Sequence, residues 1–129
     1  MIYERITLPA VKCANIGEIM LTKLEEQVLV TVWKFDGEGY GVNVFNHLEK
    51  IVEKKITLGV IYDTMERLRK KGCLDTQMGD PTPVRGGMRK KYYQITKAGI
   101  EALVKAQETH EKVMEGFGQL LTRYKAERP

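Results

Sequence analysis

The chain has 129 residues, of which 43% are hydrophobic and 29% charged, with a formal net charge of +4. This length suits a single domain with one core, and the composition is that of an ordinary globular protein. No stretch approaches the roughly 20 apolar residues that a membrane span needs, so the sequence excludes a membrane protein.

The first 20 residues precede the predicted helices and carry several charges, so they lack the apolar region of a secretory signal. Cys13 and Cys73 lie far apart without CxxC spacing, whereas small secreted domains usually carry more cysteines. We therefore expect a cytoplasmic protein in which both thiols are reduced.

A first helix is predicted to begin after Thr22, which has with Glu25 the spacing of a capping box. Apolar residues then recur at mostly helical spacing until Asp36 and Gly37 break the pattern. A second amphipathic helix is expected over about residues 42–53.

A third helix is predicted by the stretch TLGVIYDTMERLRKK, with Thr57 as its cap and its end near Lys71. Ile61, Met65 and Leu68 form its apolar stripe and are expected to face inward.

A β-hairpin with a long tip is predicted next, because the strand-like runs CLDTQM and MRKKYYQIT flank the Gly/Pro-rich segment GDPTPVRGG. Within the second run, Tyr93 and Ile95 alternate with Gln94 and are expected to face the core.

A single long helix is predicted from a Thr96 cap over residues 97–125, a length of about 40 Å. Such a helix is longer than a domain of this size can cover, so we expect it to pack on another chain. Its apolar seam has coiled-coil spacing, although Gly116 and Gly118 weaken the helix. The seam consists of Ile100, Leu103, Gln107, His110, Met114, Phe117, Leu121 and Tyr124.

Charge is unevenly distributed, because Arg85 to Lys97 holds only basic charges while acids dominate between Glu18 and Glu49. Three helices followed by a basic hairpin are typical of a winged helix-turn-helix, a mainly α fold with a small β-hairpin wing (α+β). The expected organisation is an N-terminal extension (1–20), a winged helix-turn-helix domain (21–96) and a long C-terminal dimerisation helix (97–129).

The uncovered face of the third helix is a candidate for reading double-stranded DNA, since a helix N-terminal half fits the roughly 12 Å wide major groove. A glycine there permits close backbone approach, hydroxyls can contact phosphates or bases, and a carboxylate can accept from cytosine. Basic residues beside it would neutralise phosphates. The candidates are Lys54, Lys55, Thr57, Gly59, Val60, Tyr62, Asp63, Glu66, Arg85, Arg89 and Lys90.

Some residues of this region also have structural interpretations. Tyr62 is expected to contact DNA, with cover of the core edge as the alternative. Arg67 is expected to pair with Glu25 or Glu26 rather than with DNA, and Lys71 is expected to complement the C-terminal end of its helix.

The chain resembles the PadR family of transcriptional regulators over about residues 17–100, through LEEQVLVTVW, YGVNVFNHLE, ITLGVIYDTMERLRKKGCL and RGGMRKKYYQITKAG. The resemblance implies a homodimeric repressor whose last helix makes the dimer and whose third helix and wing bind a pseudo-palindromic operator. Its DNA-facing positions correspond here to Thr57, Gly59, Val60 and Tyr62, with Tyr40 near the DNA backbone and Arg89 in the wing.

Two features depart from the family pattern. Val60 stands where many members have a small polar residue, so hydrogen-bonded base readout there is in question. Residues 1–16 extend beyond the usual start, as an added arm, a short helix on the dimer, or a segment preceding a true start at Met20.

The resemblance also raises the possibility of a small aromatic effector, because a tryptophan on the first helix of such a dimer can face a cavity between subunits. Trp33 would occupy that position here, with a buried core position as the alternative. The other candidate lining residues are Phe35, Met114 and Phe117.

A winged-helix module that binds another protein remains an alternative to DNA binding. An enzyme is disfavoured, because the sequence lacks a Gly-rich phosphate loop, GxSxG and a nucleophile–base set. His47 and His110 are too isolated for a metal site, so neither a metal nor another cofactor is predicted.

Overall fold

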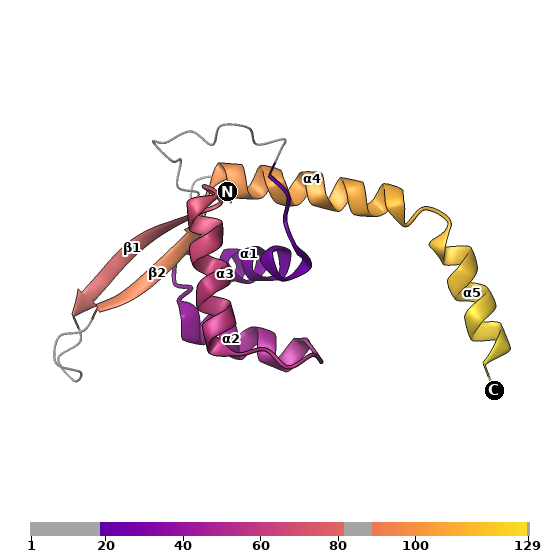
Figure 1. The fold of residues 1–129 in the computed structure, drawn as a ribbon, viewed down its shortest axis with the longest axis horizontal. Helices are drawn as coiled ribbons and strands as arrows, with labels where there is room; N and C mark the ends of the chain where they lie inside the picture. Colours follow the sequence, from indigo (N-terminus) through magenta and orange to yellow (C-terminus); the bar gives the residue numbers. More distant parts are fainter. Residues whose placement is uncertain (1–18, 82–88, 129) are drawn as a thin grey trace.

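The computed structural model describes residues 19–81 and 89–128, and these ranges contain five helices and one antiparallel hairpin (Figure 1). The elements in chain order are α1 (Lys23–Phe35), α2 (Gly41–Ile51), α3 (Leu58–Lys70), β1 (Leu74–Pro81), β2 (Arg89–Ile95), α4 (Lys97–Val113) and α5 (Phe117–Glu127). The expected mainly α fold with a β-hairpin wing is confirmed.

The core lies where α1, α2 and α3 meet the base of the hairpin. The predicted inward stripe of α3 is confirmed, since Ile61, Met65 and Leu68 are fully buried. Tyr93 and Ile95 of β2 are buried as the strand alternation predicts. Burying each large apolar side chain contributes roughly 1.5–3 kcal/mol, so these stripes hold the three helices together.

The wing pairs β1 with β2 in antiparallel register from Leu74↔Ile95 to Met78↔Lys91. An irregularity follows before Pro81↔Arg89, so β1 extends beyond its predicted end at Met78. The expected tip of the hairpin, including Arg85, lies outside the described residues.

The turn between α1 and α2 joins the wing, a contact that the sequence did not reveal. Asp36 has a left-handed backbone with φ 55° and Gly37 has φ 88°, which reverses the chain after α1. The chain then forms a bridge with β2, in which the Tyr93 amide donates to the carbonyl of Gly39 at 2.7 Å. The helical body and the wing are therefore connected by backbone as well as by side chains.

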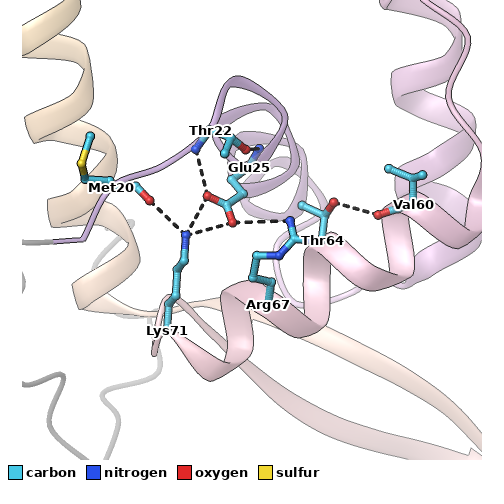
Figure 2. A network of polar contacts seen from close by, with 7 residues as sticks. All are labelled: Met20, Thr22, Glu25, Val60, Thr64, Arg67 and Lys71. Carbon is cyan, nitrogen blue, oxygen red and sulfur yellow. Dashed lines mark hydrogen bonds and ion pairs between the residues drawn. The ribbon is translucent and has the colours of Figure 1, made fainter.

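A buried carboxylate joins α1 to the end of α3 (Figure 2). Glu25 is fully buried and accepts from the Thr22 amide at 2.9 Å, which confirms the capping box. The Lys71 ammonium donates to both Glu25 oxygens at 2.9 Å and to the Met20 carbonyl at 3.0 Å. The predicted pairing of Arg67 with Glu25 is confirmed at 3.8 Å. Lys71 therefore does more than complement a helix end, because it neutralises a buried charge.

The prediction of one continuous helix over 97–125 is wrong. α4 ends at Val113, and α5 begins at Phe117 after Gly116, which has φ 87°. A glycine in the left-handed region ends the helical hydrogen bonding, and α5 then runs away from the line of α4 (Figure 1). Only the first turns of α4 join the core, through Ala98, Gly99 and Ala102.

Gly99, near the start of α4, packs closely against Cys73 and Ile95. A Cβ at this position would collide with the Cys73 carbonyl oxygen and lie 2.9 Å from Cγ1 of Ile95. Gly99→Ala should therefore lower the free energy of unfolding by about 1–3 kcal/mol, measured by urea denaturation, despite the better helix propensity of alanine. Gly118→Ala is the control, because no atom lies within 4 Å of the added Cβ. Equal effects of the two substitutions would contradict this packing.

Candidate nucleic-acid interface

The N-terminal half of α3 presents an exposed face beside its buried stripe. Gly59 and Asp63 are exposed, and Val60 and Tyr62 are 42% and 41% exposed, respectively. Thr57 orders this end of the helix, because its hydroxyl oxygen accepts from the Val60 amide at 3.2 Å. The predicted outward positions of Gly59, Val60, Tyr62 and Asp63 are confirmed. Contact of these residues with DNA stays a prediction.

Gly59 leaves the backbone of the first turn of α3 open. A Cβ built there would meet nothing nearer than the Thr57 hydroxyl oxygen at 4.0 Å. The glycine is therefore not required by packing within the protomer. An approaching DNA backbone or base edge could reach the main chain here.

Tyr62 contacts α2 and is also half-exposed. Its ring lies against Gly41, where any Cβ would collide with the ring. Both sequence interpretations thus apply, since the ring covers the start of α2 while the residue keeps an exposed surface. The absence of a Cβ at Gly41 therefore leaves room for the Tyr62 ring.

Aromatic contacts connect the start of α2 to the wing. Tyr40 packs edge-to-face on Tyr92 of β2, with ring centroids 5.7 Å apart. The Lys90 ammonium lies 4.5 Å from the centroid of the Tyr40 ring, within cation–π range. Together with the contact between Tyr62 and Gly41, these contacts make one continuous surface from α3 to the wing. We call it the helix–wing surface, formed by Tyr40, Gly59, Val60, Tyr62, Asp63 and Lys90.

Glu66 forms a second connection between α3 and the wing. Its Oε2 accepts from the Tyr93 hydroxyl at 2.7 Å and from the Lys91 ammonium at 2.8 Å. Its Oε1 accepts from Nε of Arg69 at 3.0 Å. The carboxylate is thus engaged within the protein, which argues against the expected acceptance of a hydrogen bond from cytosine.

These contacts change the acidity of both partners. The hydrogen bonds from Lys91 and then Tyr93 lower the pKa of Glu66 from 4.5 to about 2. Burial, together with the neighbouring Glu66 carboxylate, raises the pKa of the Tyr93 phenol above its ordinary value. Glu66 is therefore ionised, and Tyr93 protonated, throughout the physiological pH range.

The lowered pKa of Glu66 predicts a pH-dependent contribution to stability. Its ionised form is favoured in the folded state, so the contribution is complete above the ordinary pKa of 4.5 and is lost as the pH falls toward about 2. The difference in unfolding free energy between wild type and Glu66→Gln should shrink over that interval, as measured by urea denaturation at several pH values. A difference that stays constant with pH would contradict these contacts.

The other predicted DNA contacts lie in three places. Lys54 and Lys55 are exposed in the segment that connects α2 to α3, close in sequence to the start of α3. Arg89 is the first residue of β2, and Arg85 lies outside the described residues. The structure thus brings residues of α3, the start of α2 and β2 together, while the place of the wing tip stays a prediction.

The predicted dimerisation seam divides into two parts. Ile100 and Leu103 pack partly against the core of their own protomer. The remaining six residues of the seam, all beyond them, are exposed on α4, α5 and the turn between them: Gln107, His110, Met114, Phe117, Leu121 and Tyr124. The apolar members of this set, together with Val113 and Leu120, are exposed in a single protomer. We call residues 107–127, which carry them, the C-terminal arm.

The predicted effector residues lie in two places in the described part of the protomer, on α1 and around the turn after α4. Trp33 is 42% exposed, so it is not a core residue, and the Phe35 ring packs against His47 at 6.0 Å. Met114 and Phe117 flank the turn after α4. A hollow of about 310 Å³ between α1 and α2 is lined by other residues of α1 and by His47, Leu48 and Ile51 of α2, and by none of these four. An effector site at these positions stays a prediction.

In the described part of the chain, no group of three or more His, Cys, Asp or Glu side chains could hold a metal ion. Cys73 is buried, whereas Cys13 lies outside the described residues. Over the same ranges, none of the helices combines the length and apolarity that crossing a bilayer requires.

Three helices followed by a basic hairpin, with one face of the third helix exposed, define a winged-helix fold of the DNA-binding class. The sequence profile described as "Transcriptional regulator PadR-like family" matches residues 28–105, more than half of the chain. The chain belongs to the PadR-like family of transcriptional regulators.

Solved structures of similar fold agree with this assignment. A PadR-like transcriptional regulator from Bacillus cereus strain ATCC 14579 is 26% identical, with 76% of this chain and 90% of that chain covered and a TM-score of 0.60. A Streptococcus transcriptional regulator is 27% identical, covering 74% and 89%, with a TM-score of 0.56. A PadR-like transcription factor from Bacteroides fragilis, at 18% identity, 75% and 88% coverage and a TM-score of 0.60, supports the fold alone. The comparison with curated protein sequences finds no match.

Proposed function

We propose that the protein is a homodimeric repressor that binds a pseudo-palindromic operator through the helix–wing surface. The observation that carries the proposal is the continuity of this surface, in which Tyr62 contacts Gly41 and Lys90 lies over the ring of Tyr40. A helix face suited to the major groove is thereby held beside a cation suited to a phosphate.

In this proposal the exposed face of α3 enters the major groove. Val60 is suited to contact a thymine methyl group, and the open backbone at Gly59 allows close approach to the DNA. Lys90 would lie against the sugar–phosphate backbone, with Lys54 and Lys55 on the flanking side. Phosphate contacts fix the position of the protein, while the groove contacts distinguish sequences.

Dimerisation would place two such surfaces on successive major grooves, about 34 Å apart. The support is the C-terminal arm, which leaves Phe117, Leu121 and Tyr124 exposed in the protomer. Pairing of two arms would remove these side chains from water, and the bound dimer would occlude a promoter.

The proposal is tested with DNA from upstream of the gene that encodes the protein. Fluorescence anisotropy is measured at about 50 mM and about 200 mM salt with unrelated competitor DNA, and sedimentation equilibrium gives the oligomeric state. Binding that survives competitor and weakens steeply with salt is expected, because bound phosphates release counterions. Binding abolished by competitor at both salt concentrations would instead favour the protein-interaction module, and a monomer at working concentrations would overturn the dimer.

A further inference from the structure

We propose that Glu66 is a positioning residue that increases discrimination between operator and random DNA, by withholding two cations from phosphates and by tying the wing to α3. This inference rests on the proposed function. Its basis is geometric, because one carboxylate joins donors from two elements, Arg69 on α3 and Lys91 and Tyr93 on β2.

The two ion pairs withdraw charge from a surface that would meet DNA. The Lys91 ammonium lies 2.8 Å from Glu66 and Nε of Arg69 lies 3.0 Å from it, with both cationic side chains about two-fifths exposed. A cation that reaches a phosphate adds affinity without sequence information. Holding these two on Glu66 therefore lowers affinity for any DNA, whereas Lys90 lies over the Tyr40 ring instead.

The same carboxylate determines where the wing lies relative to α3. Tyr93 donates its hydroxyl to Glu66, and its backbone amide donates to the Gly39 carbonyl. The strand that carries Lys90 is thus attached to α3 on one side and to the turn before α2 on the other. A fixed wing favours only those DNA sequences that present a base edge and a phosphate at matching positions.

Three variants separate the charge contribution from the positional one. Glu66→Gln removes the charge but keeps the shape, and Glu66→Gln/Lys91→Gln also removes one released cation. Tyr93→Phe removes the hydroxyl contact while both cations stay paired. Glu108→Gln, an exposed residue of α4, is the control for net charge. Circular dichroism confirms that each variant is folded before binding is measured.

Affinity for random DNA should rise in Glu66→Gln. The fold loss of this affinity between about 50 mM and about 200 mM salt should be up to about tenfold larger than in the wild type. The reason is that each added phosphate contact steepens the logarithmic salt dependence by roughly 0.9. The ratio of operator to random affinity should fall about tenfold. Glu66→Gln/Lys91→Gln should restore part of the wild-type salt dependence. Tyr93→Phe should lower the ratio of operator to random affinity without steepening the salt dependence.

The outcomes distinguish this inference from the proposed function. If the wild type discriminates between operator and random DNA while Glu66→Gln changes neither salt dependence nor ratio, the inference about Glu66 is overturned and the proposed function stands. If the wild type itself shows no discrimination, the proposed function fails first. A simple loss of folding would lower binding to all DNA, so a rise in random-DNA affinity cannot result from it.

Discussion

Replacing Lys71 by methionine should lower the free energy of unfolding by roughly 3 kcal/mol, the lower end of the range for breaking a buried ion pair. The substitution leaves the fully buried Glu25 carboxylate without the ammonium that lies 2.9 Å from both of its oxygens. The Thr22 amide and the more distant Arg67 compensate only in part. Urea denaturation followed by circular dichroism measures the loss.

The neighbouring lysine provides a matched control. Lys70 is exposed on the same turn of α3, so Lys70→Met should change stability by no more than about 0.5 kcal/mol. Adding Glu25→Gln to Lys71→Met should recover part of the loss, because the unpaired charge is then removed while a side-chain acceptor for the Thr22 amide remains. Equal losses of unfolding free energy in Lys70→Met and Lys71→Met would mean that the pair of Lys71 with Glu25 does not stabilise the fold.

Replacing Gly59 by leucine should reduce operator affinity by roughly 100-fold, equivalent to about 2.7 kcal/mol, while the protein stays folded. The leucine side chain would project from the first turn of α3, where a Cβ meets only the Thr57 hydroxyl oxygen at 4.0 Å. Because Gly59 is exposed and its Cβ position is open, the side chain should extend into solvent in the protomer but block close approach of the helix to the major groove. Anisotropy titration against the operator measures the effect.

Two other substitutions of glycine serve as controls for Gly59→Leu. Gly59→Ala should weaken binding less than leucine does, because the obstruction is smaller. Gly118 is the second residue of α5, as Gly59 is the second residue of α3, and space is open around both, so Gly118→Ala controls for helix propensity. Unchanged operator affinity in Gly59→Leu would remove the start of α3 from the DNA interface.

The local elements were predictable because their signals lie within a few residues of each other. Capping residues such as Thr22, Thr57 and Thr96 are side-chain acceptors placed directly before apolar periodicity, and the structure shows all three accepting from backbone amides. The misjudged length of the last helix also has a local cause. The sequence marks Gly116 as a weak point, but only the structure shows that α4 ends at Val113 and that the left-handed Gly116 precedes α5.

Contacts between distant residues were less predictable. Tyr93 was expected to face the core, and a buried tyrosine hydroxyl needs a partner, yet nothing in the sequence identifies Glu66 as that partner. Likewise, Lys90 was recognised as basic, but its place over the Tyr40 ring depends on how β2 lies against the start of α2. Such pairs depend on chain paths that local patterns do not specify.

Apolar periodicity and caps act over short distances along the chain, so the three helices of the body, the hairpin wing, the inward stripes and the family are predictable from the residues alone. Which charges are available to a partner depends instead on the tertiary structure. It assigns Lys71 to a buried carboxylate and Lys91 to Glu66, and it leaves Lys90 at the helix–wing surface. The physical reason is that an ionic or hydrogen-bonded contact forms only between groups within a few ångströms, and the packing of helices against the wing sets those distances.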